Sequence, residues 1–171
     1  KEVWVNVGGP SGEMLRPTMP VPEGMDWNLW LGPAPFRGYH KDYHPARWRG
    51  CRDFSGGGMT DWGAHHFDIA QWGLGMDHAG PIEVIPPEAG IYPDLTYKYP
   101  ADVLVRVVPG RLDRSKHPIP KGWEERTPLQ VFGALFVGER GWIHVGRGGY
   151  LQSFPADVVK NYPPDYDQMI A

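Results

Sequence analysis

The stretch GGGMTDWGAHHFDIAQW at residues 56–72 constrains this chain most, because it predicts a helix with an unusual polar stripe. Successive residues of an α-helix turn by about 100°. Four side chains therefore point in nearly one direction: Asp61, His65, Asp68 and Trp72. An ordinary amphipathic helix uses such a stripe for aliphatic residues. We expect this helix to be buried on several faces and its polar stripe to face an enclosed cleft.

The ends of the predicted helix carry recognisable signals. Ser55 or Thr60 can cap its first turn, and Gly73 and Gly75 can end it. The glycines at 56–58 lack the spaced Gly-x-Gly-x-x-Gly pattern of a nucleotide-binding loop. We interpret them as positions where the backbone approaches another segment closely as the chain enters the helix.

Strand patterns flank a long irregular segment. Residues 2–7 alternate with valines on one face, which predicts a half-buried strand. Further strands are predicted at 82–85 and 95–108, and a hairpin joins 129–137 to 141–145. Between 8 and 55, seven prolines exclude long helices and central strands, which predicts a long, ordered Pro/Gly/aromatic loop. The fold class is α+β, with an open, mainly antiparallel or mixed sheet and the site helix packed on one face.

We expect one α+β substrate-binding domain over residues 1–171, in which 155–171 form a truncated tail. The chain is predicted to be a fragment of a larger protein. The sheet face opposite the helix is expected to be broad, apolar and open. Such a face predicts a homo-oligomer that buries it.

Charge and composition exclude several partners. The net charge is only −3 and the basic residues are dispersed, which argues against nucleic acid and an anionic membrane surface. No apolar run approaches the roughly 20 residues that span a bilayer. Cys51 is the only cysteine, so the chain cannot form an intramolecular disulfide.

The polar stripe fits the oxidation of a secondary alcohol. This reaction needs a base for the hydroxyl proton, and histidine is the side chain that changes charge near neutral pH. His65 is therefore the candidate catalytic base. Asp61, one turn earlier, can bind a sugar hydroxyl or orient the imidazole. Asp68 can bind substrate or make a helix-packing hydrogen bond, and both interpretations stay open.

The irregular segment suggests a carbohydrate substrate. Pyranose rings stack their C–H faces on indoles, while their hydroxyls pair with charged side chains. Six residues are candidates for the wall of such a site: Trp27, Trp30, Arg37, Tyr39, Trp48 and Arg49. Trp48 and Arg49 are favoured because they precede the glycines that lead into the helix. Most of the six must also serve as core.

A metal site is the alternative use of the histidines. The pairs His40/His44 and Asp61/His65 have the i, i+4 spacing of ligands on a helix. Pro45 makes a helix through the first pair doubtful, and the chain has no cysteine cluster. We predict no metal ligand, and we expect His66 to be structural.

Four segments taken in order resemble the Gfo/Idh/MocA oxidoreductases, more narrowly the C-terminal domain of their bacterial branch. The segments are WNLWLGPAP at 27–35, HPARWRG at 44–50, GGGMTDWGAHHFDIAQW at 56–72 and FVGERGWIHVGRG at 136–148. The resemblance implies an N-terminal Rossmann domain in cis that binds NAD or NADP, followed by an α+β domain that shapes the substrate pocket and often mediates oligomerisation. It leaves the compartment open between the cytoplasm and periplasm of a bacterium.

The resemblance also assigns the stripe. Asp61 and His65 match the family's Asp-x-x-x-His pair beside the reacting sugar or polyol carbon, and Asp68 and Trp72 match the Asp and Trp that follow. The family's nucleotide fingerprint and its Glu-Lys-Pro motif, whose Lys assists proton transfer, are absent, since no Lys here precedes Pro. We therefore expect no cofactor-binding residue in this chain, no bound NAD(P), and no activity of the chain alone.

Two other functions remain open from the sequence. One is a non-catalytic carbohydrate-binding or assembly module, in which the stripe only holds a sugar. The other is metal-assisted elimination or hydrolysis at a sugar, by a lyase or hydrolase. The sequence does not choose between NAD and NADP or identify the sugar.

Overall fold

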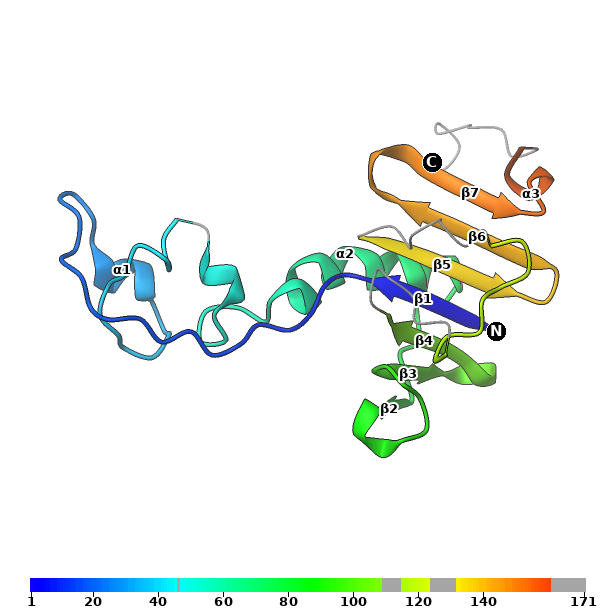
Figure 1. Ribbon diagram of the computed structural model, residues 1–171, viewed down its shortest axis with the longest axis horizontal. Helices are drawn as coiled ribbons and strands as arrows, with labels where there is room; N and C mark the ends of the chain where they lie inside the picture. Colours follow the sequence, from blue (N-terminus) through cyan, green and yellow to red (C-terminus); the bar gives the residue numbers. More distant parts are fainter. Residues whose placement is uncertain (46, 109–114, 124–131, 161–171) are drawn as a thin grey trace. The chain divides into compact units, whose positions relative to one another are not determined.

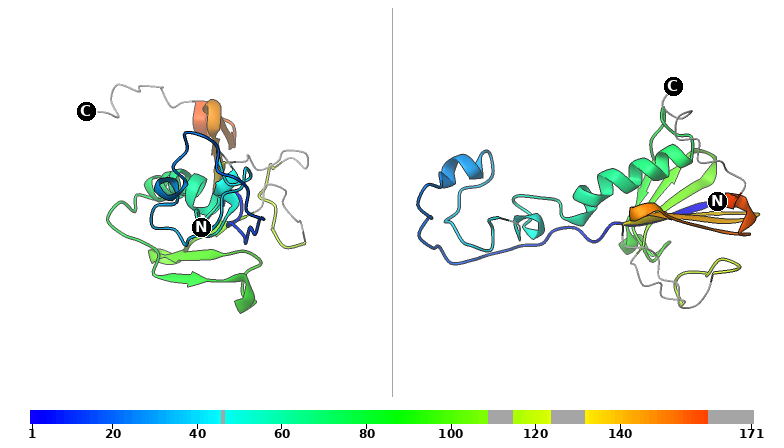
Figure 2. Two further views of the ribbon diagram at one scale, coloured as in Figure 1. Left: turned by 90° about the vertical axis from the view of Figure 1, so that its left-hand side faces the viewer. Right: turned by 90° about the horizontal axis from the view of Figure 1, so that it is seen from above.

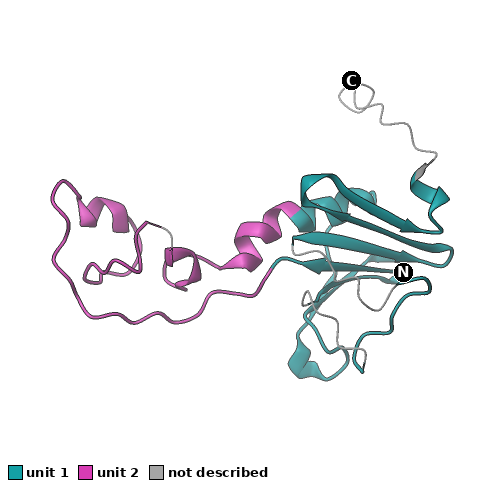
Figure 3. Cartoon of the chain, turned by 45° about the horizontal axis from the view of Figure 1, so that its top comes forward, with its two compact units in different colours: residues 1–7, 66–171 teal, residues 8–65 magenta. Residues whose placement is uncertain are grey.

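The computed structural model describes residues 1–45, 47–108, 115–123 and 132–160. The chain forms two units (Figure 3): unit 1 comprises residues 1–7 and 66–171, and unit 2 comprises residues 8–65. The boundary lies inside helix α2 (Gly58–Gly73), between His65 and His66. Each unit therefore contains one half of this helix.

The described part of unit 1 forms an open sheet of seven strands in the order β2-β3-β4-β1-β5-β6-β7 (Figure 1). Its strands are β1 (Glu2–Asn6), β2 (Glu83–Ile85), β3 (Thr96–Tyr99), β4 (Val103–Val107), β5 (Gly133–Gly138), β6 (Gly141–Gly146) and β7 (Tyr150–Phe154). Strands β1 and β4 run parallel, and the other neighbouring pairs run antiparallel. The predicted α+β fold with an open, mixed sheet is confirmed.

Strand β1 lies in the centre of the sheet, between β4 and β5. Val3, Trp4 and Val5 are each at most 1% exposed, so both faces of the strand are buried. The prediction of a half-buried strand is wrong here. A half-buried strand needs one face in water, whereas both faces of β1 are covered by other parts of unit 1.

Residues 95–108 are predicted as one strand but form two antiparallel strands. Strand β3 ends at Tyr99, and strand β4 starts again at Val103, its partner in the register. Pro100 cannot donate to a strand ladder, so it ends β3. Ala101 and Asp102 then reverse the chain with φ values of 60° and 54°. The 3₁₀ turn η3 (Pro100–Asp102) thus separates the two strands.

The predicted hairpin after residue 132 is confirmed where the structure describes it. Gly138 of β5 pairs with Gly141 of β6, which leaves Glu139 and Arg140 as the connection. Predicted hairpin residues 129–131 lie outside the described residues. Strand β7 is not predicted by the sequence pattern. The short helix α3 (Asp157–Lys160) follows in the tail, of which 161–171 also lie outside the described residues.

The second half of α2 packs on one face of the sheet, as predicted (Figure 2). Phe67 makes an edge contact with Tyr97 at 5.6 Å between ring centres, and the Tyr99 hydroxyl donates to Gln71 Oε1 at 3.1 Å. Burial raises the pKa of both tyrosines. The helix ends as Gly75 (φ 67°) donates to the carbonyl of Trp72, a typical Schellman C-cap.

The opposite face of the sheet carries a second core. Trp4, Leu135 and Trp142 pack there with Val108 and Trp123, and Ile119 and Phe154 lie against them. Residues 115–123 thus cover part of the face that the sequence predicts to be open. The apolar surface expected to drive oligomerisation is therefore partly used within the chain itself.

A buried ionic network joins β1, β4 and the covering segment. Arg106 is 3% exposed; its Nη1 donates to Glu2 Oε2 at 3.2 Å and its Nη2 to Asp94 Oδ2 at 3.0 Å. His117 Nε2 lies 2.8 Å from the same Asp94 oxygen. Trp4 Nε1 donates to Glu2 Oε2 at 2.7 Å. Burial of this guanidinium is tolerable because two carboxylates face it.

Unit 2 contains little regular structure besides its half of α2. It has a five-residue helix, α1 (Trp27–Leu31), capped by the Asp26 side chain, and the 3₁₀ turn η1 (Arg47–Gly50). Two isolated bridges pair Pro10 with Gly57 and Gly12 with Cys51. Its core comprises Trp27, Leu31, Tyr39, Tyr43 and Cys51. The predicted long, ordered aromatic loop corresponds to this unit.

Within the described ranges, no helix combines the length and apolar character needed to cross a membrane.

Candidate functional site

The start of α2 is held by a close backbone approach. Gly57 has φ 75°, and a Cβ on it would overlap the backbone of Pro10 and Ser11. Ser55 Oγ accepts the Gly57 N–H at 3.1 Å. The interpretation of the glycine run as a close-approach segment is confirmed. The first turn of the helix, which carries Asp61, is thereby fixed to the segment at residues 9–11.

Asp61 forms an ion pair with a second predicted site residue. Arg49 Nε lies 3.3 Å from Asp61 Oδ2, and the two side chains are 54% and 42% exposed. The Arg49 guanidinium also lies over the Trp48 ring, 4.6 Å from its centre. Trp48 is held in turn by a hydrogen bond from its Nε1 to the Pro45 carbonyl at 3.1 Å. Three predicted site residues, Trp48, Arg49 and Asp61, are therefore in contact.

His65 lies one helical turn after Asp61, and both side chains are exposed. Its ring centre is 5.9 Å from that of Trp62. The buried face of α2 consists instead of Gly63, His66 and Ala70. The expectation that the helix is buried on several faces, with its stripe in an enclosed cleft, is wrong. The stripe lies on the exposed face, because small residues and His66 provide the packing surface.

Asp68 and Trp72 belong to the unit 1 half of the helix. Asp68 is exposed, and Trp72 is 58% exposed. No described contact ties Asp68 to the sheet, so the helix-packing alternative gains no support. His66 is 1% exposed, and its ring centre lies 6.3 Å from that of Phe132, which agrees with a structural role.

Arg37 lies at the centre of the unit 2 fold. Its guanidinium pairs with Asp53 and donates to the Met14 carbonyl and the Tyr43 hydroxyl, at 3.1 and 3.3 Å. Its charged group also lies 5.1 Å from the centre of the Phe54 ring. These contacts give Arg37 a structural role in unit 2.

Tyr39 is 8% exposed and packs edge-on against Trp27, with 5.3 Å between ring centres. The Met19 N–H donates to its carbonyl at 2.7 Å. Tyr39, like Trp27, thus belongs to the unit 2 core. Among the described contacts, neither Arg37 nor Tyr39 touches Asp61 or His65.

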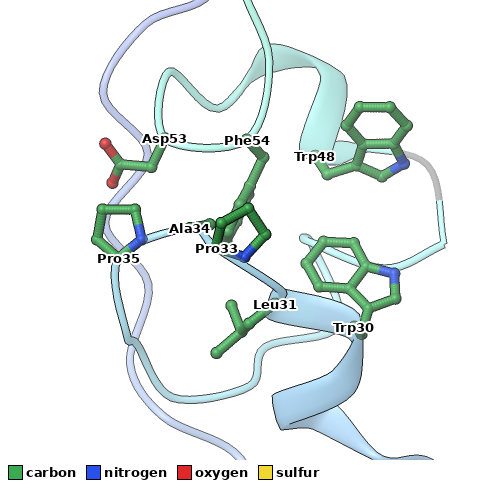
Figure 4. Close-up of a pocket in the computed structure, with 8 residues that line it drawn as sticks. All are labelled: Trp30, Leu31, Pro33, Ala34, Pro35, Trp48, Asp53 and Phe54. Atoms are coloured by element: carbon green, nitrogen blue, oxygen red, sulfur yellow. The ribbon is translucent and has the colours of Figure 1, made fainter.

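An open aromatic groove of about 570 Å³ lies next to Trp48 (Figure 4). It is lined by Trp30, Leu31, Pro33, Ala34, Pro35, Trp48, Asp53 and Phe54. Sequence reasoning missed Asp53 and Phe54 as site residues. Their position could have identified them, because they lie in the same segment as Trp48 and Arg49, shortly before the glycines at 56–58.

The histidine pair at 40 and 44 makes local contacts. His40 Nδ1 accepts the Asp42 N–H at 3.0 Å, and His44 lies edge-on to Trp30 with 5.9 Å between ring centres. The Arg16 guanidinium, hydrogen-bonded to Asp42, lowers the pKa of that carboxyl. Among the residues that the structure describes, no three His, Cys, Asp or Glu side chains form a group that could hold a metal ion.

Comparison with known families gives a match. The model of the Gfo/Idh/MocA group described as "Oxidoreductase family, C-terminal alpha/beta domain" matches residues 4–100, more than half of the 171 residues. The matched span includes residues 4–6 of β1, all of unit 2, and strands β2 and β3. No curated protein matches the chain.

Proposed function

The chain belongs to the Gfo/Idh/MocA oxidoreductase family, as its C-terminal alpha/beta domain, and we propose that it binds the substrate of an NAD(P)-dependent enzyme acting on a sugar, a sugar derivative or a polyol. One observation carries this proposal. Asp61 and His65 are exposed one helical turn apart, and Arg49 pairs with Asp61 at 3.3 Å. A carboxylate, an imidazole and a guanidinium on one accessible surface suit a ligand rich in hydroxyl groups.

In this proposal His65 takes the proton from the hydroxyl of the carbon that is oxidised. Asp61 accepts a hydrogen bond from a neighbouring hydroxyl, and Arg49 holds the Asp61 carboxylate in position. NAD(P)+ bound by the N-terminal domain would accept the hydride. Trp48, which stacks on Arg49, contacts a more distant part of the substrate.

The start of α2 does not fit a dinucleotide, although the N-terminus of a helix can bind phosphate. The Met59 N–H donates to the Gly9 carbonyl at 3.3 Å, and the Asp61 carboxylate lies in the first turn, where it would repel a phosphate. The proposal therefore assigns the cofactor to an N-terminal domain in cis. On its own, the chain would not catalyse the reaction.

The test is a dehydrogenase assay of the full-length protein with NAD+ and NADP+ against a panel of sugars and polyols. We expect His65→Ala to lower kcat by about 100-fold or more. Added imidazole should restore part of the activity, because the side chain is exposed. Asp61→Asn should lower kcat/KM by about tenfold. Asp77→Asn, an exposed carboxylate beyond the helix, is the matched control.

Full activity of His65→Ala with every substrate of the panel would contradict the proposed base. Saturable sugar binding without reduction of either cofactor would support the non-catalytic carbohydrate-binding module instead. A requirement for added metal ions would support the lyase or hydrolase alternative.

The proposed function includes self-association through the sheet, but on the face that carries α2 rather than on the opposite face that the sequence predicts. Val84 and Leu151, 57% and 51% exposed, lie on the outermost strands β2 and β7, and the register puts both on the face that carries α2. Exposed apolar residues at such positions are typical of interfaces. Light scattering should give a dimer or larger species, and Leu151→Glu should shift it toward monomer. A monomer at high concentration would contradict this part of the proposal.

A further inference from the structure

The aromatic groove lined by Trp48 supplies none of the groups that act on the oxidised carbon in the proposed reaction. Trp30 comes from α1, Trp48 from η1, and Phe54 from the turn that follows. In Figure 4 the two indoles lie on one side of the groove, Asp53 and Pro35 on the other, and Pro33, Ala34 and Phe54 between them. A volume of about 570 Å³ is within the range of small-ligand sites.

The three aromatic side chains are only partly used by the core of unit 2. Trp30, Trp48 and Phe54 are each half-buried, so part of every ring remains accessible. Trp30 stacks on Trp27 with 4.7 Å between ring centres, and Phe54 lies edge-on to Trp30 at 5.2 Å. These contacts fix the rings in place before a ligand arrives. A preformed aromatic surface loses little conformational entropy on binding.

The polar side of the groove is a single carboxylate. Asp53 pairs through Oδ2 with Arg37, and its side chain is 34% exposed. A carboxylate has two oxygens and can accept several hydrogen bonds, so this pair leaves acceptor capacity for hydroxyl groups. Flat apolar walls with an acceptor at the rim suit a ring that has a C–H face and hydroxyls at its edge. A pyranose has both features.

The groove is connected to the candidate catalytic pair through one residue. Trp48 lines the groove, Arg49 stacks on the Trp48 ring at 4.6 Å, and the same Arg49 pairs with Asp61 at 3.3 Å. We propose that the groove is a second saccharide subsite. It holds a ring glycosidically linked to the ring that is oxidised beside Asp61 and His65, so the substrate is a glycoside or an oligosaccharide. This inference rests on the proposed function.

Titration calorimetry of the full-length protein with matched ligands tests the subsite. The pairs are methyl β-D-glucopyranoside with cellobiose, methyl α-D-glucopyranoside with maltose, and methyl β-D-galactopyranoside with β-1,4-galactobiose. In at least one pair the disaccharide should bind about tenfold more tightly than the methyl glycoside.

Two variants act on the groove in different ways. Ala34→Phe fills it, and Trp30→Leu removes a wall. Both should bring the disaccharide to the affinity of its methyl glycoside and leave the methyl glycoside unchanged. Leu29→Ala is the matched control on α1, because Leu29 is 79% exposed and does not line the groove. Circular dichroism of each variant checks that it is folded.

The outcomes separate this inference from the proposed function. Three results would each overturn the subsite. The first is equal affinity for the two members of every pair, and the second is no binding of any disaccharide. The third is an equal loss of affinity for both members of a pair in Ala34→Phe. Oxidation of monosaccharides with no groove effect would leave the proposed function intact. Tight disaccharide binding that depends on Ala34 and Trp30, without any NAD(P) reduction, would support the subsite and contradict the oxidoreductase.

Discussion

Unit 1 is held together mainly by its backbone, whereas unit 2 is held together mainly by side chains. In the described part of unit 1, seven strands form hydrogen bonds to their neighbours in one continuous sheet. Unit 2 has only two isolated bridges and a five-residue helix besides its half of α2. Its backbone path is therefore held mainly by stacked aromatic rings and by the contacts of Arg37. The main candidate site residues, Trp48, Arg49, Asp61 and His65, all belong to unit 2.

This difference between the two units is common in proteins, where a regular scaffold supports irregular segments that carry functional side chains. A hydrogen-bonded sheet tolerates little variation in its path, while an irregular segment can present side chains in many arrangements. Substrate preference can therefore change in unit 2 with little effect on the sheet. The following experiments test this contrast, from the largest expected effect to the smallest.

Arg106→Ala tests how strongly unit 1 depends on its buried ions. The substitution leaves Glu2 and Asp94 without their shared cation, which should lower the free energy of unfolding by about 3–5 kcal/mol. Urea denaturation followed by circular dichroism measures the change. Lys98→Ala, which removes the exposed pair with Asp102, should change little. Equal effects of the two substitutions would mean that the network does not stabilise the sheet.

Gly57→Ala tests the backbone anchor of unit 2. The substitution combines a positive φ with overlap against Pro10 and Ser11, and it should cost about 2 kcal/mol of stability. Gly24→Ala shares the positive φ but meets no atom within 4 Å, so it should cost about 1 kcal/mol. Hydrogen exchange should show that Gly57→Ala lowers the protection of backbone amides in unit 2. A loss of amide protection spread evenly over the strands of the sheet would contradict the contrast between the units.

His144 makes unit 1 sensitive to acid. Burial lowers its pKa from 6.5 to about 4, so the folded state binds fewer protons than the unfolded state between these values. Stability is therefore full above pH 6.5 and falls as the pH drops toward 4, by about 2 kcal/mol after relaxation around the charged ring. Urea denaturation at several pH values measures this slope. His144→Phe should reduce the dependence of the unfolding free energy on pH. An unchanged dependence would mean that other titrating groups cause the loss of stability in acid.

Arg49→Gln separates stability from function in unit 2. The Arg49–Asp61 pair is exposed, so its loss should change the free energy of unfolding by less than about 0.5 kcal/mol. The same change should raise KM for the sugar by about tenfold, because the Asp61 carboxylate loses its partner. Arg52→Gln, at an exposed position nearby, is the control. An unchanged KM would remove Arg49 from the candidate site.

The fold could be predicted where local signals agree with the tertiary structure. The helix ends at the predicted glycines because Gly75 adopts the left-handed conformation of a Schellman cap. The single strand predicted at 95–108 failed because the chain reverses after Pro100, where Ala101 adopts a positive φ that alanine does not signal. The double burial of β1 depends on neighbours about 100 or more residues away in sequence, so valine alternation alone could not reveal it.

The sequence could predict which residues belong to the candidate site but not which of them contact one another. The helical period identified Asp61 and His65 as neighbours, yet it gave no means of finding Arg49 as the partner of Asp61. Among the aromatic and Arg residues of the irregular segment, the sequence favoured Trp48 and Arg49 only by their position before the glycines, and it did not show which of the others form the core. The structure separates Trp48 and Arg49, which are accessible, from Arg37 and Tyr39, which hold unit 2 together.

The central position of β1 has a consequence for the order of folding during synthesis. Its residues leave the ribosome before those of its partners, Val103–Val107 and Gly133–Gly138. At about 5–20 residues per second, roughly 100 residues of translation separate β1 from its parallel partner, which corresponds to about 5–20 s. Unit 2 lies in this interval and makes mostly local contacts, so it can fold first. The strand at the centre of the sheet is thus made early and paired late.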